Sequence, residues 1–178
     1  MPCAATGEMV PASVLYPTAA EEQEVVLGRY PASLAPDAPV HGGPHPVVLV
    51  SHGTGSSPYL HRTLAAHLAR RGFVAALVEH PRDDRDCGDL AGTATILRNR
   101  PLHLRAVLDH VLADGDLGSG VPEVGVGVVG HFSFLSPFPP YLVNPALPPS
   151  QDPPGFDRPV FFETFPDEVR RFLDRHLR

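Results

Sequence analysis

Three short apolar runs, residues 47–51, 73–79 and 124–130, constrain the fold of this 178-residue chain more than any other feature. Each run is dominated by β-branched and other apolar residues, which is typical of a strand that is covered on both faces. Segments with helical periodicity lie between the runs. The order strand, helix, strand, helix, strand predicts a parallel sheet with right-handed crossovers.

The first helix has recognisable ends. Ser57 predicts its N-cap, Pro58 its first position, and Gly72 the residue just beyond its C-terminal end. Its buried face is predicted from a leucine at every fourth position, Leu60, Leu64 and Leu68.

Two further helices are expected. The second begins near Pro101 and stops by Gly115 or Gly118, and the last begins near Thr164, which forms a capping box with Asp167. The buried side chains expected in the second helix are Leu104, Leu108, Val111 and Leu112. Those expected in the last helix are Val169, Phe172, Leu173 and Leu177.

The segments outside this pattern are strand candidates and loops. Residues 10–17 and 24–32 predict two antiparallel N-terminal strands. Residues 132–160 are so rich in proline that regular structure is excluded over most of the segment. We expect a single domain over residues 1–178, in which residues 1–131 form its N-terminal half and residues 161–178 its C-terminal helix.

Composition excludes several classes of function. The net charge of −6 and the lack of a basic run exclude a nucleic-acid partner. The chain has no lysine, which excludes Schiff-base chemistry and a Walker-type phosphate site. Cys3 and Cys87 are too few for a disulfide framework, and no apolar run approaches the roughly 20 residues of a membrane span. We therefore expect a cytoplasmic protein with no bound metal and no cofactor.

Several motifs together resemble the front half of an α/β-hydrolase. Within that fold, the chain is similar to the predicted dienelactone hydrolase group, close to the platelet-activating-factor acetylhydrolases. The motifs are "LYP", "VVLGRYPA", His-Gly-Thr-Gly after the first apolar run, "RGFVAALVEHP" and "NRPLHLRAVLDHVL". The resemblance implies an α/β fold, a truncated α/β-hydrolase with a mostly parallel sheet and flanking helices. It also implies hydrolysis of a small carboxylic ester or lactone through a serine acyl-enzyme.

The tail of the chain resembles the C-terminal end of the same group. In that end, Gly-His-Phe carries the catalytic histidine, which here implies His131 as the general base. The segment that would hold the Gly-His-Ser-x-Gly-Gly serine and the strand with the acidic partner is missing. We infer an internal deletion joined at Gly130-His131. The loss of later strands would uncover a sheet edge, so we expect a homo-oligomer or poor solubility.

A candidate oxyanion hole lies between a buried strand and a helix N-terminus. Gly53, Thr54 and Gly55 follow His52 there, and backbone N–H groups in such a turn can hold an oxyanion. The backbone N–H of Thr54 or Gly55 is the expected donor. The alternative interpretation is a glycine-rich turn that serves packing only.

The nucleophile is less well defined. Ser133 is the nearest serine to the expected position, but Phe132 and Phe134 flank it where an elbow needs glycine, and it falls one residue late. A loop serine is the alternative. His131 needs a nucleophile and an acid within reach, and the serines before it do not lie on an elbow. The serines considered as partners of His131 are Ser51, Ser56, Ser57 and Ser119.

Other polar residues do not form a recognisable site. The acidic loop lacks the spacing of a calcium loop, so we interpret it as a solvated loop whose carboxylates are Asp83, Asp84, Asp86 and Asp89. The helical histidines lack zinc spacing, and we expect most of them at the surface or half-buried: His61, His67, His103 and His110.

Two functions stay open, an ester hydrolase and a catalytically inactive remnant that acts as a binding or oligomerising domain.

Overall fold

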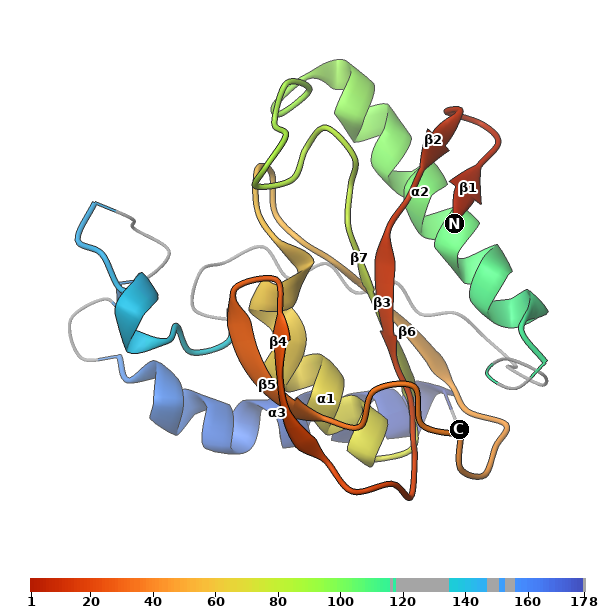
Figure 1. Cartoon of the computed structure of the whole chain (residues 1–178), viewed down its shortest axis with the longest axis vertical. Coiled ribbons are helices and arrows are strands. Elements are labelled where there is room, and N and C mark those ends of the chain that lie inside the picture. The colour runs from red at the N-terminus through yellow and green to blue at the C-terminus, as the bar shows by residue number, and fades with distance from the viewer. Residues whose placement is uncertain (116, 118–134, 147–150, 153–155, 178) are drawn as a thin grey trace.

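The computed structural model describes residues 1–115, 117, 135–146, 151–152 and 156–177. A three-stranded sheet in the order β3, β7, β6 lies at its centre (Figure 1). β7 pairs in parallel with β6 and antiparallel with β3. The strands β1 and β2 form a separate antiparallel pair, and so do β4 and β5. The strands are β1 (Pro2–Cys3), β2 (Glu8–Met9), β3 (Ala12–Leu15), β4 (Gln23–Leu27), β5 (Tyr30–Leu34), β6 (Val47–Ser51) and β7 (Val74–Val78).

The expectation of a mostly parallel sheet is wrong. Among the described residues β6 and β7 form one parallel pair, whereas three other pairs are antiparallel. A parallel pair needs a long crossover, which here is the helical segment between β6 and β7. β4 and β5 are joined by a short turn, which can only give an antiparallel pair. The third expected parallel strand, 124–130, lies outside the described residues.

The N-terminal strand expected at residues 24–32 is in fact a hairpin. β4 and β5 pair from Gln23 with Leu34 to Leu27 with Tyr30, so the chain reverses at Gly28. Gly28 has a φ of +62° and lies close to the ring of Tyr59, and both features favour a residue without a side chain. The turn was hidden in the sequence because apolar residues continue on both sides of it.

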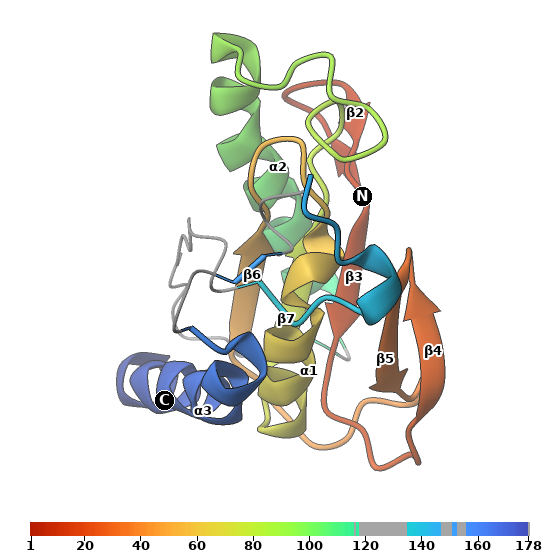
Figure 2. The same cartoon turned by 90° about the vertical axis from the view of Figure 1, so that its left-hand side faces the viewer.

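The two apolar strands at the centre have the predicted positions and are covered on both faces. All five residues of β7 are buried. Ala75 and Leu77 face one apolar cluster, while Val74, Ala76 and Val78 face another on the opposite side of the sheet. Figure 2 shows α1 on one face and α2 behind the other. Successive side chains of a strand point to opposite faces. Because an apolar cluster covers each face of β7, every residue of the strand is apolar.

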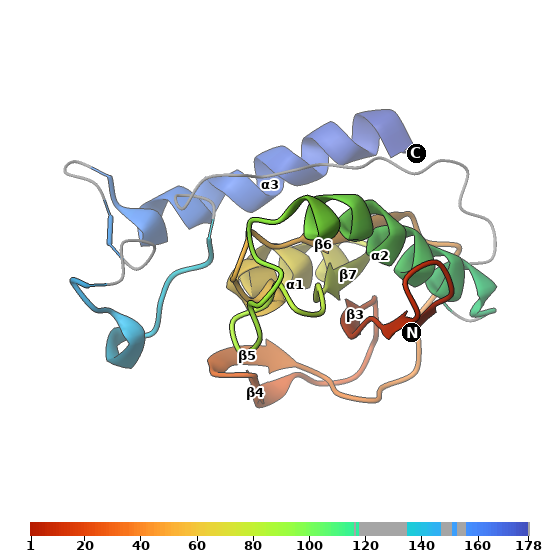
Figure 3. The same cartoon turned by 90° about the horizontal axis from the view of Figure 1, so that it is seen from above.

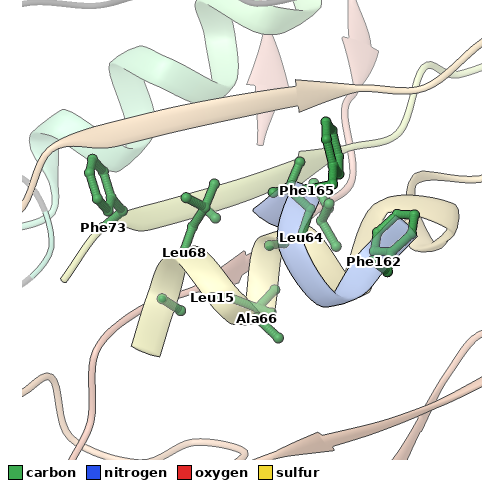
Figure 4. Close-up of a cluster of buried hydrophobic side chains, with 11 residues drawn as sticks. Leu15, Leu64, Ala66, Leu68, Phe73, Phe162 and Phe165 are labelled. Atoms are coloured by element: carbon green, nitrogen blue, oxygen red, sulfur yellow. The ribbon is translucent and has the colours of Figure 1, made fainter. Parts of the chain in front are cut away.

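The first helix follows its predicted signals. It begins as a 3₁₀ turn, η1 (Pro58–His61), capped by the Ser57 side chain, and continues as α1 (Arg62–Arg70). Gly72 follows the end of α1 with a φ of +90°. All three predicted leucines are buried, and Leu64 and Leu68 lie in the cluster that Figure 4 shows.

The second helix, α2 (Ala94–Ala113), begins earlier than predicted. Thr93 caps it by accepting a hydrogen bond from the backbone N–H of Ile96, so Pro101 lies inside the helix rather than at its start. Of the four predicted core residues Val111 is buried, whereas the three leucines pack at the edge of the cluster. The buried face is Ile96, His103, Val107 and Val111.

The last helix, α3 (Arg158–Leu177), also begins before its predicted start. Phe162 and Phe165 of its first half pack on α1, and Figure 3 shows α3 lying along the outside of the molecule. In place of a cap, Asp167 forms an ion pair with Arg170, and its Oδ1 lies 3.3 Å from Nε2 of His67. Phe172 was predicted to be buried but is 54% exposed, because the helix is in contact with α1 mainly through its earlier turns.

The described part of the proline-rich segment docks on the N-terminal end of α1. Ser136 is fully buried, its Oγ accepts a hydrogen bond from the backbone N–H of Thr63, and its own N–H donates to Leu60 O. The buried guanidinium of Arg62 donates to Pro137 O and Pro31 O. The described part of this segment includes a short 3₁₀ turn, η3 (Pro140–Leu142).

Candidate functional site

A glycine-rich turn, His52–Gly55, follows β6 at the C-terminal end of the sheet. Gly55 has a φ of +61°, a left-handed conformation that favours glycine. Its N–H donates to Asp83, both to the backbone O at 3.1 Å and to Oδ1 at 3.0 Å. The N–H of Gly55, one of the two expected oxyanion donors, is therefore used within the protein in this structure.

The ring of His52 fixes the orientation of the next peptide group. His52 is buried, and its Nδ1 lies 2.7 Å from Gly53 O, while its Nε2 accepts a hydrogen bond from the backbone N–H of His80. Nδ1 therefore carries the ring proton and donates to Gly53 O. Burial lowers the pKa of His52, which keeps this neutral tautomer.

The fixed orientation of the Gly53–Thr54 peptide group makes the backbone N–H of Thr54 the better candidate for an oxyanion donor. Gly53 O accepts hydrogen bonds from His52 and from the backbone N–H of Ser56. The peptide bond between Gly53 and Thr54 is trans, so the N–H of Thr54 points away from Gly53 O and from both of its donors. Thr54 is exposed. Its N–H can donate to a group that approaches from solvent.

An ion pair between Asp83 and Arg100 stabilises the glycine-rich turn. Asp83 is fully buried, and its Oδ2 lies 3.6 Å from Nη1 of Arg100 on α2. Arg100 also donates through Nη2 to His52 O. Burial lowers the pKa of the Arg100 guanidinium, and the negative charge of Asp83 opposes this effect. The pair joins the turn, the acidic loop and α2.

A chain of four polar side chains runs from the end of β6 toward the N-terminal hairpin. Ser51 Oγ lies 2.8 Å from His80 Nε2, His80 Nδ1 lies 3.3 Å from His103 Nδ1, and His103 Nε2 lies 3.0 Å from Glu8 Oε2. The rings of His80 and His103 are stacked and fully buried.

His80 stays neutral in this environment. Its pKa is lowered to about 2, mainly by burial and then by the nearby charge of Arg100 and by His52 and His103. A full positive charge on His80 is therefore disfavoured near neutral pH.

The sequence prediction found only part of this site. Gly53, Thr54 and Gly55 lie at the turn as expected, whereas His131 and Ser133 lie outside the described residues. The residues that sequence reasoning missed are Glu8, Ser51, His80, Asp83, Arg100 and His103.

Two expectations about polar residues are wrong. Most of the four helical histidines were expected at the surface or half-buried, but His61 and His103 are buried, and Asp83, which was expected in a solvated loop, is fully buried. His80 could have been found from its position directly after the apolar run of β7, because parallel strands bring their C-terminal ends together. Among the described residues, no group of histidine, cysteine and acidic side chains could hold a metal ion.

A separate cleft of about 760 Å³ lies between β3, the β4–β5 hairpin and the end of α1. Its volume is in the range of small-molecule sites. His45 lines it, but both ring nitrogens of His45 contact backbone carbonyls, those of Gly72 and His41. The Ser51–His80 pair and the glycine turn do not line this cleft.

Comparison with known families decides what the turn resembles. The family model described as platelet-activating factor acetylhydrolase, isoform II, matches residues 23–99. Over this stretch the chain is platelet-activating-factor acetylhydrolase-like. The resemblance expected from the sequence is thus confirmed over β4 to the start of α2, less than half of the chain, and the matched part includes the glycine turn. Searches of curated proteins and of solved structures gave no significant match.

The acetylhydrolase-like match supports an esterase-like family and a small-molecule ester as the kind of substrate. In the part of the chain that the structure describes, no helix is long and apolar enough to cross a membrane.

Proposed function

We propose that this protein hydrolyses small carboxylic esters or lactones through a serine acyl-enzyme, with the backbone N–H of Thr54 as an oxyanion donor. The observation that supports the proposal most is the family match over residues 23–99, which spans the whole turn. The orientation of the Gly53–Thr54 peptide adds a physical reason, because hydrogen bonds from His52 and Ser56 fix its carbonyl and Thr54 is an exposed residue. A donor fixed in advance stabilises charge that develops on the substrate carbonyl.

By resemblance, His131 would act as general base if Ser133 is the nucleophile, and a serine elsewhere in the chain would need a base of its own. The chemistry needs a serine, a base within hydrogen-bond distance, and a donor for the oxyanion. Ser133→Ala tests the sequence-based assignment. If activity is unchanged in that variant, the nucleophile lies elsewhere.

Turnover of 4-nitrophenyl esters with acyl chains of increasing length tests the reaction class. We expect hydrolysis of the acetyl ester and inhibition by a fluorophosphonate. A protein that folds but neither turns over these esters nor reacts with the fluorophosphonate would contradict the proposal.

Replacement of Thr54 tests the oxyanion donor. Thr54→Pro removes the N–H, and we expect kcat to fall by about 10²- to 10³-fold with KM little changed, since the donor acts mainly in the transition state. Thr54→Ala keeps the N–H and serves as the matched control. An equal loss in both variants would show that the side chain, not the N–H, matters.

The inactive remnant is favoured by a different observation, the use of the Gly55 N–H by Asp83. As a binding or oligomerising domain, the protein would use an uncovered sheet edge. Within the described residues β3 and β6 are the outer strands of the central sheet. Sedimentation velocity at micromolar concentration tests self-association, and a clean monomer would count against it.

A further inference from the structure

The chain of hydrogen bonds from Ser51 to Glu8 has one direction when both histidine rings are neutral. The Glu8 carboxylate can only accept, so His103 donates to it through Nε2–H. With both rings neutral, His103 Nδ1 is then an acceptor and His80 Nδ1–H donates to it. His80 Nε2 is left as an acceptor, and its partner among the described residues is Ser51, whose hydroxyl therefore donates to it.

This polarity is the one that a nucleophilic serine requires. A serine becomes reactive when its hydroxyl donates to a base whose other nitrogen is held by an acceptor. The distance of 2.8 Å from Ser51 Oγ to His80 Nε2 is within hydrogen-bond reach. Both rings are buried, whereas Ser51 and Glu8, at the two ends of the chain, are only partly buried, so the Ser51 end is not closed off from solvent.

The position of Ser51 also fits the turn. Ser51 is the last residue of β6 and precedes Thr54 by three positions, so nucleophile and oxyanion donor lie at the same end of one strand. His80 follows β7, which pairs in parallel with β6 and brings its C-terminal end to the same edge.

We propose that Ser51 is a nucleophile of this protein, with His80 as its general base and with His103 and Glu8 as positioning residues. The proposal rests on the proposed function, because it names the nucleophile of the same ester hydrolysis. It replaces the serine of a nucleophile elbow with a serine at the end of a strand.

The reaction balances with the groups present, an ester and water. Ser51 Oγ forms a bond to the carbonyl carbon while its proton passes to His80 Nε2, and the carbonyl electron pair moves to the oxygen that faces the Thr54 N–H. The bond to the leaving alkoxide then breaks, and the alkoxide takes the proton from His80. Water repeats the attack on the acyl group of Ser51, restores the Ser51 hydroxyl and releases the carboxylic acid.

The two positioning residues explain how a buried ring can take a proton. The environment disfavours a full charge on His80. As Nε2 receives the serine proton, Nδ1–H can move toward His103, and His103 Nε2–H can move toward the Glu8 carboxylate. The positive charge is then shared next to the negative charge of Glu8 instead of resting on His80.

Peptide mapping of the fluorophosphonate adduct tests the proposal without any variant. We expect the adduct on Ser51 in the wild-type protein, and its loss in Ser51→Ala with Ser56→Ala as the matched control. An adduct on Ser133 would overturn the assignment of Ser51 and leave the proposed function intact. If no serine is labelled and no ester is turned over, both the assignment and the proposed function fail.

Glu8→Gln tests the role of the positioning residues. The amide oxygen still accepts from His103 but lacks the negative charge, so we expect labelling of Ser51 to slow about 100-fold, within the range that general base catalysis contributes. The thermal midpoint reports folding separately. A labelling rate that does not change in a folded Glu8→Gln protein would overturn the relay, because a purely structural hydrogen bond would not affect that rate.

Discussion

The apolar core around β6 and β7, called here the apolar half, is built differently from the polar network at the C-terminal ends of these strands, called here the polar half. From Val47 to Val50 and from Val74 to Val78 the side chains are apolar and pack into two clusters on opposite faces of the sheet. At their C-terminal ends the same strands give way to Ser51 and His80, which enter a network of buried hydrogen bonds. The apolar half is held by many interchangeable contacts, whereas the polar half depends on a few specific partners.

This difference affects what a substitution can do. In the apolar half a smaller side chain leaves a cavity, whose cost depends on volume. In the polar half the removal of one partner leaves a buried group without its hydrogen bond or counter-charge. Three substitutions and one change of pH test the polar half, the apolar half and the contact of the proline-rich segment with α1.

Loss of Asp83 should have a large effect on stability. Asp83→Ala leaves the half-buried Arg100 guanidinium without its counter-charge and removes the side-chain acceptor of the Gly55 N–H, so we expect a loss of about 3 kcal/mol. Urea unfolding measures it. Asp86→Ala, at an exposed position of the same loop, is the control, and an equal loss in both would contradict the assignment of a buried pair.

Truncation of Leu68 tests the apolar half. Leu68 is fully buried against the sheet, so Leu68→Ala should lower the free energy of unfolding by about 2–5 kcal/mol. Leu97 is 66% exposed, and Leu97→Ala should cost far less. The rate of Ser51 labelling per folded molecule should stay the same. A selective loss of labelling would show that the halves are not independent.

Acid should destabilise the polar half through His80. Its pKa is lowered from 6.5 to about 2 in the folded state, so below pH 6.5 the unfolded state binds a proton that the folded state does not. Stability is then lost as the pH falls from 6.5 toward 2, at up to about 1.4 kcal/mol per pH unit from this group. His80→Asn should flatten this slope in urea unfolding, whereas the exposed His110→Gln should not.

A smaller effect is expected where the proline-rich segment meets α1. Ser136→Ala removes the acceptor for the Thr63 N–H, and loss of such a cap costs about 1 kcal/mol. Thermal unfolding of Ser136→Ala measures this cost. Ser33→Ala, at an exposed position of β5, is the control, and a Ser136→Ala midpoint equal to wild type would contradict the docking.

The sequence predicted the apolar half well because burial there follows from residue type alone. The runs that became β6 and β7, the Ser57 cap and the three leucines of α1 all depend on contacts that are local or nonspecific. The antiparallel pairing of β3 with β7 could not be predicted in this way, because strand partners are not encoded in the periodicity of one segment.

The polar network was hidden for a related reason. Glu8 and His103 are 95 positions apart, and Asp83 and Arg100 belong to a loop and a helix whose packing the sequence does not reveal. A histidine or a carboxylate looks the same in a solvated loop and in a buried pair. The glycine turn could be predicted because its residue types are tied to local backbone geometry, as the φ of Gly55 shows.

Trapping of the acyl-enzyme tests the central claim most directly. The protein is mixed with 4-nitrophenyl acetate, quenched in acid during turnover, and examined by intact mass and peptide mapping. The account predicts one acetyl group on the peptide that contains Ser51, and its absence from Ser51→Ala. Turnover with the acetyl group on another residue, or with Ser51 unmodified and Ser51→Ala fully active, would contradict it.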